Sequence, residues 1–183
     1  MYQIGQLVIY GGNGVCRVSG YEAPPYPHTD KSQQFYRLEP LYQDGVIYTP
    51  VNTRVFMRPV ISKEEAEKLI DMIPTIHAKA HFDGSVTQLS TYYESFFKSH
   101  NCEDLMNLVM SIYAKKLYVE SVRKKFGQMD EKFMKRAEFL LNSELAVALG
   151  ISKDDVFVYI SSRVGKLEDA EPPDKTPPET KKL

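Results

Sequence analysis

The chain has 183 residues, with 23 Lys and Arg against 24 Asp and Glu. Its hydrophobic share of 43% and charged share of 26% are typical of a soluble globular protein, and no apolar run is long enough to span a membrane. The start lacks the pattern of a secretory signal, and two distant cysteines suit a reducing compartment. We therefore expect a cytoplasmic protein with no membrane partner. The net charge of −1 excludes nucleic-acid binding by bulk charge alone.

Residues 1–60 have the pattern of short strands separated by turns. Apolar and β-branched residues on both sides of Gly11-Gly12-Asn13-Gly14 predict a first hairpin over 7–18. A proline-rich loop at 23–30 follows, and a second hairpin is predicted over 34–49 with its turn at Asp44-Gly45. A last short strand is expected at 54–58. Five strands of this length indicate a small sheet or barrel of SH3 or Tudor size.

Helical signals begin at residue 62. Ser62 and Glu65 predict a capping box at the start of a first helix, which Pro74 ends. Residues 74–85 have the composition of a linker, and a second helix is expected at 87–98. Asn101 is predicted to cap a third helix. We expect the basic residues 123–125 in its last turn and Gly127 just beyond its end.

A fourth helix is predicted from Asp130 to Gly150. Ser152 predicts the start of another, although the run 156–160 also has the propensity of a strand. The composition of the last residues predicts disorder. The expected class is α+β, with a small N-terminal Tudor/SH3-like β-barrel followed by a C-terminal helical bundle. The predicted boundaries are the barrel at 1–60, a helix and linker at 61–84, the helical domain at 85–165 and a disordered tail at 166–183.

No arrangement of residues in the sequence indicates catalysis. The glycines at 11–14 form neither a dinucleotide-binding motif nor a Walker loop, and Ser, Asp and His are scattered. Ala78 stands where a metalloprotease motif would need Glu. We expect no enzyme, no cofactor, no metal and no small-molecule substrate. The remaining alternative is an enzyme or metal protein built on His77, His81, His100 and Cys102, against the simpler interpretation of exposed linker histidines.

Three features suggest binding, and each has a simpler interpretation. Between Tyr113 and Arg136, eight Lys and Arg stand against three acids, which predicts a basic surface or an ordinary solvated helix face. The aromatic run at 92–97 could stack on bases, although such a stripe is more often core. The strand at 46–49 could be an exposed edge that takes a partner strand.

Several short motifs resemble the CarD/CdnL family of bacterial transcription regulators. Ile4-Gly5-Gln6-Leu7-Val8-Ile9-Tyr10 is similar to the family's opening φ-G-D-x-V-V-Y, and Gly14-Val15 to its H-G-V. Phe35-Tyr36-Arg37-Leu38 resembles its third strand, Thr49-Pro50-Val51 its V-P segment, and Leu140-Leu141-x-x-Glu144-Leu145-Ala146 its I-L-x-x-E-L-A. Members join a Tudor-like RNA polymerase-interacting domain, also found in transcription-repair coupling factors, to a helical DNA-binding domain.

The chain also departs from the family pattern. The usual Y-P-x-H-G turn reads Tyr10-Gly11-Gly12-Asn13-Gly14, so its Pro and His are absent. Well-known relatives present a Trp from the helical domain to the opened promoter, and this chain has no Trp. By rough alignment that place falls near Leu89, with Tyr92 and Tyr93 close by.

The resemblance implies a transcription regulator that binds the β subunit of bacterial RNA polymerase through its β domain. Its helical domain would modulate promoter opening through weak, sequence-tolerant contacts with promoter DNA. The expected polymerase-binding residues are Val46, Ile47, Tyr48 and Thr49. The expected DNA-binding residues are Leu89, Tyr92, Tyr93, Lys115, Lys116, Arg123, Lys124, Lys125, Lys132, Lys135 and Arg136. The alternative is a protein-interaction adaptor that binds polymerase or another partner without contacting DNA.

Overall fold

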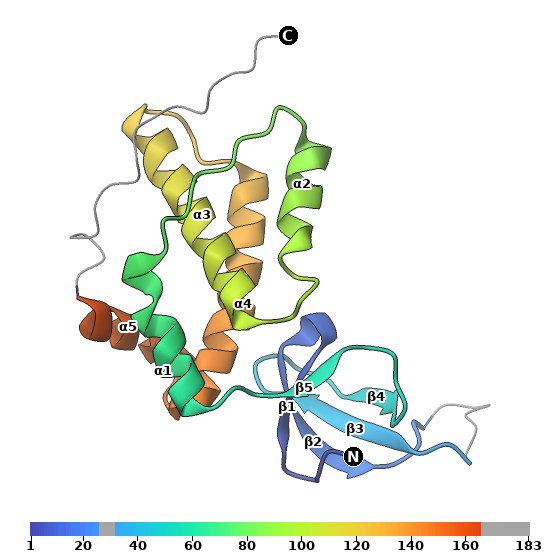
Figure 1. The fold of residues 1–183 in the computed structure, drawn as a ribbon. Helices are drawn as coiled ribbons and strands as arrows, with labels where there is room; N and C mark the ends of the chain where they lie inside the picture. The colour runs from blue at the N-terminus through green and yellow to red at the C-terminus, as the bar shows by residue number, and fades with distance from the viewer. Residues whose placement is uncertain (26–31, 166–183) are drawn as a thin grey trace.

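The structure, a computed structural model, describes residues 1–25 and 32–165. A β-sheet formed by the first sixty residues packs against one end of a helical region (Figure 1). The strands are β1 (Leu7–Tyr10), β2 (Val15–Tyr21), β3 (Phe35–Pro40), β4 (Ile47–Pro50) and β5 (Met57–Pro59). The helices are α1 (Lys63–Asp71), α2 (Val86–Ser95), α3 (Cys102–Ser121), α4 (Gln128–Leu149) and α5 (Val156–Val164). The predicted disordered tail and most of the proline-rich loop lie outside the described residues.

The five strands form one antiparallel sheet in the order β4-β3-β2-β1-β5. Both predicted hairpins are present, and the α+β class is confirmed. The strands bury one face around Val8, Val18, Tyr36 and Leu38, because alternate side chains of a strand point to the same side. In the described residues, β4 and β5 are the two ends of the strand order. A closed barrel therefore remains a prediction.

The turn between β1 and β2 brings the sheet against the helices. It is a single 3-10 turn, Gly11–Asn13, followed by Gly14 at φ 74°. A β-carbon on Gly14 would lie 3.2 Å from Cδ2 of Leu140 in α4. Glycine fits here for two reasons, because it adopts positive φ without strain and lets this helix approach the turn.

The helical region has its own apolar core, to which α1 contributes. Ala66 and Ile70 of α1 are buried with Leu108 of α3 and with Phe133 and Leu145 of α4. The predicted capping box is confirmed, since Ser62 accepts a hydrogen bond from the Glu65 amide while the Glu65 carboxylate accepts one from the Ser62 amide. No helix in the described parts of the chain is both long and apolar enough to cross a membrane.

The end of α3 differs from the prediction. The helix ends at Ser121, so residues 123–125 lie beyond it rather than in its last turn. Arg123 adopts the left-handed conformation, with φ 56°, and the Lys124 amide donates to the Val119 carbonyl at 2.8 Å. These bonds satisfy the helix end before Gly127, which instead is the N-cap of α4 with φ −73°.

The last helix resolves the ambiguity between helix and strand. Ser152 accepts a hydrogen bond from the Asp155 amide and begins a 3-10 turn that leads into α5. Val156 is fully buried in the helical core, and Arg163 of α5 forms ion pairs with Glu67 and Asp71 of α1. Packing against α1 and α4 therefore outweighs the strand propensity of residues 156–160.

Candidate functional site

The predicted polymerase-binding segment forms an edge of the sheet. Only β3 pairs with β4 in the described residues, with Tyr48 opposite Arg37 and Thr49 opposite Tyr36. The Val51 amide donates to the Gln34 carbonyl at 2.9 Å, so residue 51 directs its main-chain groups toward β3. Alternate residues in an antiparallel pair do the same. The main-chain N–H and C=O of Tyr48 therefore point away from β3.

The side chains of this segment divide between the two faces of the sheet. Thr49 is buried, and Ile47 packs against the sheet core. Val46 is exposed, and Tyr48 shares the opposite face of the sheet with Arg37. Of the four predicted residues, Tyr48 thus offers outward-facing main-chain groups and a half-buried side chain to a partner, and Val46, just before the strand, offers an exposed side chain. Ile47 and Thr49 support the strand from inside.

A small charged cluster lies on the face of the sheet that Tyr48 shares with Arg37. The Arg37 guanidinium donates to Ser19 Oγ at 2.8 Å, forms an ion pair with Glu22 at 3.0 Å and contacts Glu39. A hydrogen bond with Tyr48 and a second with Glu39 raise the pKa of Arg37 above its usual range. Arg37 therefore stays charged on the face of the sheet beside β4.

Pro50 limits the length of this edge. Pro50 is two positions after Tyr48, so its main-chain nitrogen also points away from β3. That nitrogen carries no hydrogen and cannot donate to a partner strand. Proline is tolerated on edge strands for this reason and stops a hydrogen-bonded ladder. The outward-facing N–H of the β4 edge is therefore that of Tyr48.

Three of the predicted DNA-binding residues lie inside the helical region. Leu89 is 7% exposed, Tyr93 is fully buried, and Lys115 is 7% exposed. The Lys115 ammonium lies 2.8 Å from Asp130 Oδ1, and the Tyr93 hydroxyl donates to the same oxygen at 2.6 Å. Burial and then the hydrogen bond to Asp130 raise the pKa of Tyr93 well above its usual range. These residues support α2, α3 and α4 rather than form a surface.

The other cations fall into two groups. Lys135 forms an ion pair with Glu131 at 2.6 Å, and Arg136 forms one with Glu94 at 2.8 Å while its guanidinium lies 4.1 Å from the centre of the Phe97 ring. The second group forms no ion pair within residues 1–25 and 32–165; it consists of Lys116, Arg123, Lys124, Lys125 and Lys132.

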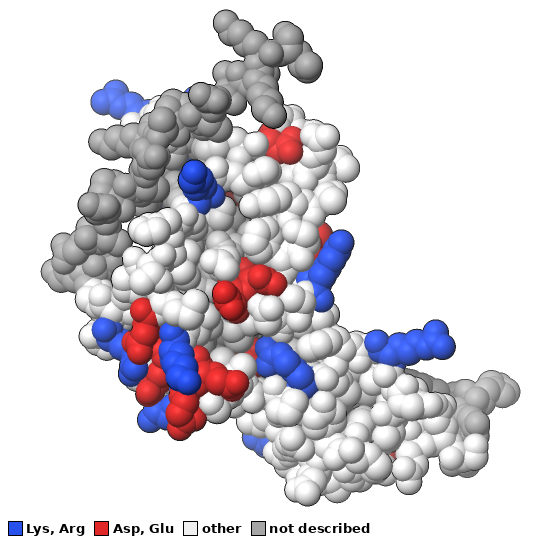
Figure 2. Space-filling view, viewed as in Figure 1, with Lys and Arg blue, Asp and Glu red and all other residues white. Residues whose placement is uncertain are grey.

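We call residues 123–125, between α3 and α4, the basic turn. All three of its side chains are exposed, and it lies at the end of the helical region opposite the sheet (Figure 1). Over α1 and α5, in contrast, acidic and basic side chains are mixed on the face drawn in Figure 2. The basic turn thus differs from that mixed surface, because its three exposed cations have no ion pair in the described residues.

Tyr92 is the one predicted aromatic site residue that reaches the surface. Its ring stacks on His81 with centroids 3.7 Å apart and meets the edge of Phe96 at 5.2 Å. No pattern in the sequence indicated the contact with His81, because that residue comes from the segment before α2. One face of the Tyr92 ring is thus already covered.

The histidines and cysteines of the alternative hypothesis show no metal site. Within the described ranges, no three His, Cys, Asp or Glu side chains are grouped so that they could hold a metal ion. His81 stacks on Tyr92, His100 stacks on Phe56, and Cys102 donates a hydrogen bond to Glu144.

Comparison with known families gives one match. Residues 2–61 match the model of the CarD-like/TRCF RID domain, a segment that covers β1 to β5 and ends before α1. This family is a non-enzymatic interaction module, and the match suggests interaction with RNA polymerase. A search of curated proteins found no match.

Proposed function

Residues 2–61 are a CarD-like/TRCF RID domain, and from this premise we propose that the chain regulates transcription by binding the β subunit of bacterial RNA polymerase. The sheet would bind polymerase through β4, and the helical region would contact promoter DNA and modulate promoter opening. The observation that carries the proposal is the free edge of β4, where the main chain of Tyr48 faces outward in a domain of this family.

Strand addition accounts for the polymerase contact in physical terms. A partner strand laid along β4 would exchange main-chain hydrogen bonds with Tyr48 and would end near Pro50. Main-chain bonds supply affinity without regard to sequence, so selectivity has to come from side chains. The half-buried ring of Tyr48 and the charged group around Arg37 are next to the added strand and can provide this selectivity.

The basic turn supports the proposed DNA contact. Arg123, Lys124 and Lys125 are exposed and have no ion pair in the described residues, and Lys116 and Lys132 are available nearby in the chain. Cations of this kind contact phosphates, which positions a protein on DNA without specifying sequence. Binding should be weak and sensitive to salt. Attachment to polymerase would raise the local concentration of DNA enough for such a contact to matter.

Proline at position 48 tests the polymerase contact. Tyr48→Pro removes the outward-facing N–H and leaves the bonds between β3 and β4 in place. We expect the full chain to bind purified RNA polymerase about 5- to 150-fold more weakly, because one hydrogen bond is lost and a partner carbonyl is left unpaired.

Tyr48→Ala is the matched control, because it removes the ring and keeps the N–H. A proline variant that binds like the alanine variant would show that β4 does not accept a strand. Binding to isolated DNA at several salt concentrations separates the two functions. A flat salt dependence would favour the adaptor that contacts polymerase alone.

A further inference from the structure

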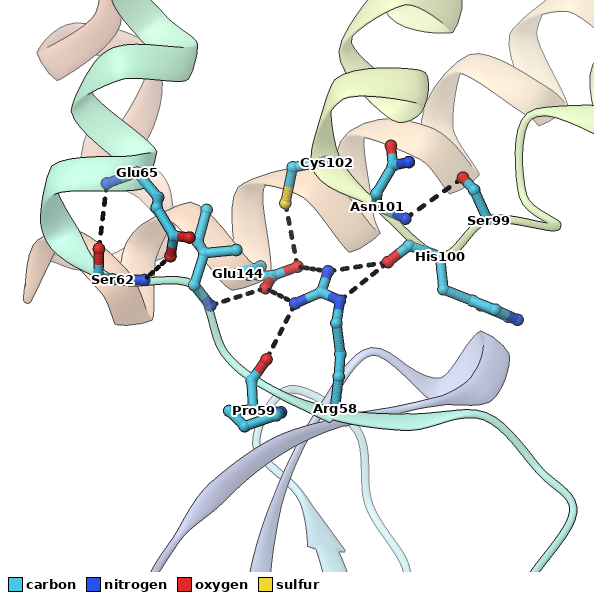
Figure 3. A network of polar contacts seen from close by, with 10 residues as sticks. Arg58, Pro59, Ser62, Glu65, Ser99, His100, Asn101, Cys102 and Glu144 are labelled. Carbon is cyan, nitrogen blue, oxygen red and sulfur yellow. Dashed lines mark hydrogen bonds and ion pairs between the residues drawn. The ribbon is translucent and has the colours of Figure 1, made fainter.

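An ion pair between half-buried Arg58 and buried Glu144 joins the sheet to the helical region. Arg58 extends from β5 toward α4, where both terminal nitrogens of its guanidinium bond the carboxylate of Glu144 (Figure 3). The distance from Nη2 to Oε2 is 2.8 Å, and Glu144 is 2% exposed. A two-pronged pair of this kind fixes direction as well as distance.

The same network includes groups from two more segments. Arg58 also donates to the His100 carbonyl, at 3.2 Å from Nε and 2.8 Å from Nη2. Glu144 accepts further bonds from the Ile61 amide at 3.1 Å and the Cys102 thiol at 3.0 Å. The network therefore ties β5, the entry to α1, the segment before α3, and α4 together.

His100 is held in an unusual conformation at this point. Its φ of 52° is left-handed although it is not glycine, and its ring stacks on Phe56 with centroids 4.5 Å apart. Such a conformation persists only where the surroundings stabilise it. Here the His100 carbonyl accepts a hydrogen bond from Arg58, and the His100 ring stacks on Phe56. Both partners belong to the N-terminal part that forms the sheet.

Apolar packing beside the network is incomplete. A crevice of about 290 Å³ lies between the turn at Gly11 and Gly12 and the helical residues Phe97 and Arg136. Beside this crevice, the polar network holds the sheet to the helices through bonds of defined direction. Separating the two parts would leave a carboxylate and a guanidinium without their partners.

We propose that Arg58 and Glu144 are positioning residues that lock the sheet and the helical region into one rigid body. The lock fixes the orientation of the β4 edge relative to the basic turn, so a partner bound at one surface constrains the position of the other. This inference does not depend on what either surface binds.

The two cysteines of the chain provide separate reporters for this lock. Cys102 lies in the network and is 5% exposed, whereas Cys16 is fully buried in the sheet core. Opening of the interface should expose Cys102 alone, and unfolding should expose both. Reaction with a small thiol reagent, followed by peptide mass spectrometry, measures the rate at each cysteine.

Arg58→Met is the informative substitution. Burial raises the pKa of the Cys102 thiol, Glu144 raises it further, and Arg58 opposes this rise. Loss of Arg58 would therefore slow the reaction of Cys102 if the interface stayed closed. We expect the opposite, a rate at Cys102 at least ~10-fold higher, which corresponds to ~1.4 kcal/mol in the free energy of opening. The rate at Cys16 should not change.

Arg163→Met is the matched control, because Arg163 forms its ion pairs between α5 and α1, away from this interface. It should leave both cysteines protected. Arg58→Lys keeps the charge and loses the two-pronged geometry, so it should open the interface to a smaller extent. Nitrogen-15 relaxation should show a single tumbling time for both parts of the wild type and two tumbling times for Arg58→Met.

Two results would overturn the proposal. One is an unchanged or lower rate at Cys102 together with a single tumbling time in Arg58→Met. The other is an equal rise at Cys102 and Cys16 in both Arg58→Met and Arg58→Lys, because the pair would then stabilise the whole fold rather than the orientation of its parts.

Discussion

Lys115 tests whether the structure correctly separates buried lysines from exposed ones. Its ammonium lies 2.8 Å from Asp130 Oδ1, and both residues are more than 90% buried. In Lys115→Met the buried carboxylate would keep only the hydrogen bond from Tyr93. Removal of one partner from a buried ion pair costs about 3–5 kcal/mol. For a chain of this size that lowers the melting temperature by about 6–20 °C.

Urea unfolding followed by circular dichroism, together with calorimetry, measures this effect. Lys116→Met is the matched control, because it makes the same change one residue along the helix, where Lys116 has no ion pair in the described residues. It should stay within about 0.5 kcal/mol of the wild type. Equal stability of the two variants would refute the argument and would return Lys115 to the set of candidate DNA contacts.

Two further predictions concern DNA and pH. Lys124→Glu combined with Lys125→Glu should weaken DNA binding and lower the slope of log affinity against log salt by about 2, since each phosphate contact contributes about 0.9. Burial raises the pKa of Tyr93, so the folded chain binds this proton more tightly than the unfolded chain does. The resulting stability is complete below about pH 10, the usual pKa of Tyr, and is lost as the pH rises further. Tyr93→Phe should therefore lose less stability between pH 9 and pH 11 than the wild type does, which urea unfolding at each pH measures.

Both predictions have internal controls. Lys63→Glu combined with Lys68→Glu makes the same change in net charge on α1, where acids and bases are mixed. Equal loss of DNA binding by the two double variants would show that only total charge matters. For Tyr93, parallel curves for the wild type and the phenylalanine variant at alkaline pH would show that its hydroxyl is not buried against Asp130.

Local signals predicted the helix starts, and long-range contacts decided the rest. Ser62, Asn101 and Ser152 cap helices as the sequence indicated, because a cap depends on residues three positions apart. The burial of Lys115 depends on Asp130 from the next helix, which periodicity alone does not reveal. The pair of Arg58 with Glu144 spans 86 positions in sequence. The local sign of this pair was Glu144, a charged residue within the apolar stripe of α4.

The candidate site followed the same division. The turn at Asp44-Gly45 indicated a hairpin, and β3 pairs with β4 accordingly. The position of β4 at the end of the strand order depends on the whole sheet. Which groups of the edge face outward depended on register, and register came from the pairing of Val51 with Gln34. The exposure of Arg123 depended on where α3 ends, because a non-glycine residue took the left-handed position there.

Pro50 has a consequence for the chain in concentrated solution. A free strand edge can pair with the same edge of another copy and lead to aggregation. The proline nitrogen cannot donate a hydrogen bond, so a ladder between two β4 strands would stop after Tyr48. A short strand from a partner still fits this length. The edge can thus pair with a short partner strand, whereas two copies of the chain cannot form a continuous sheet through it.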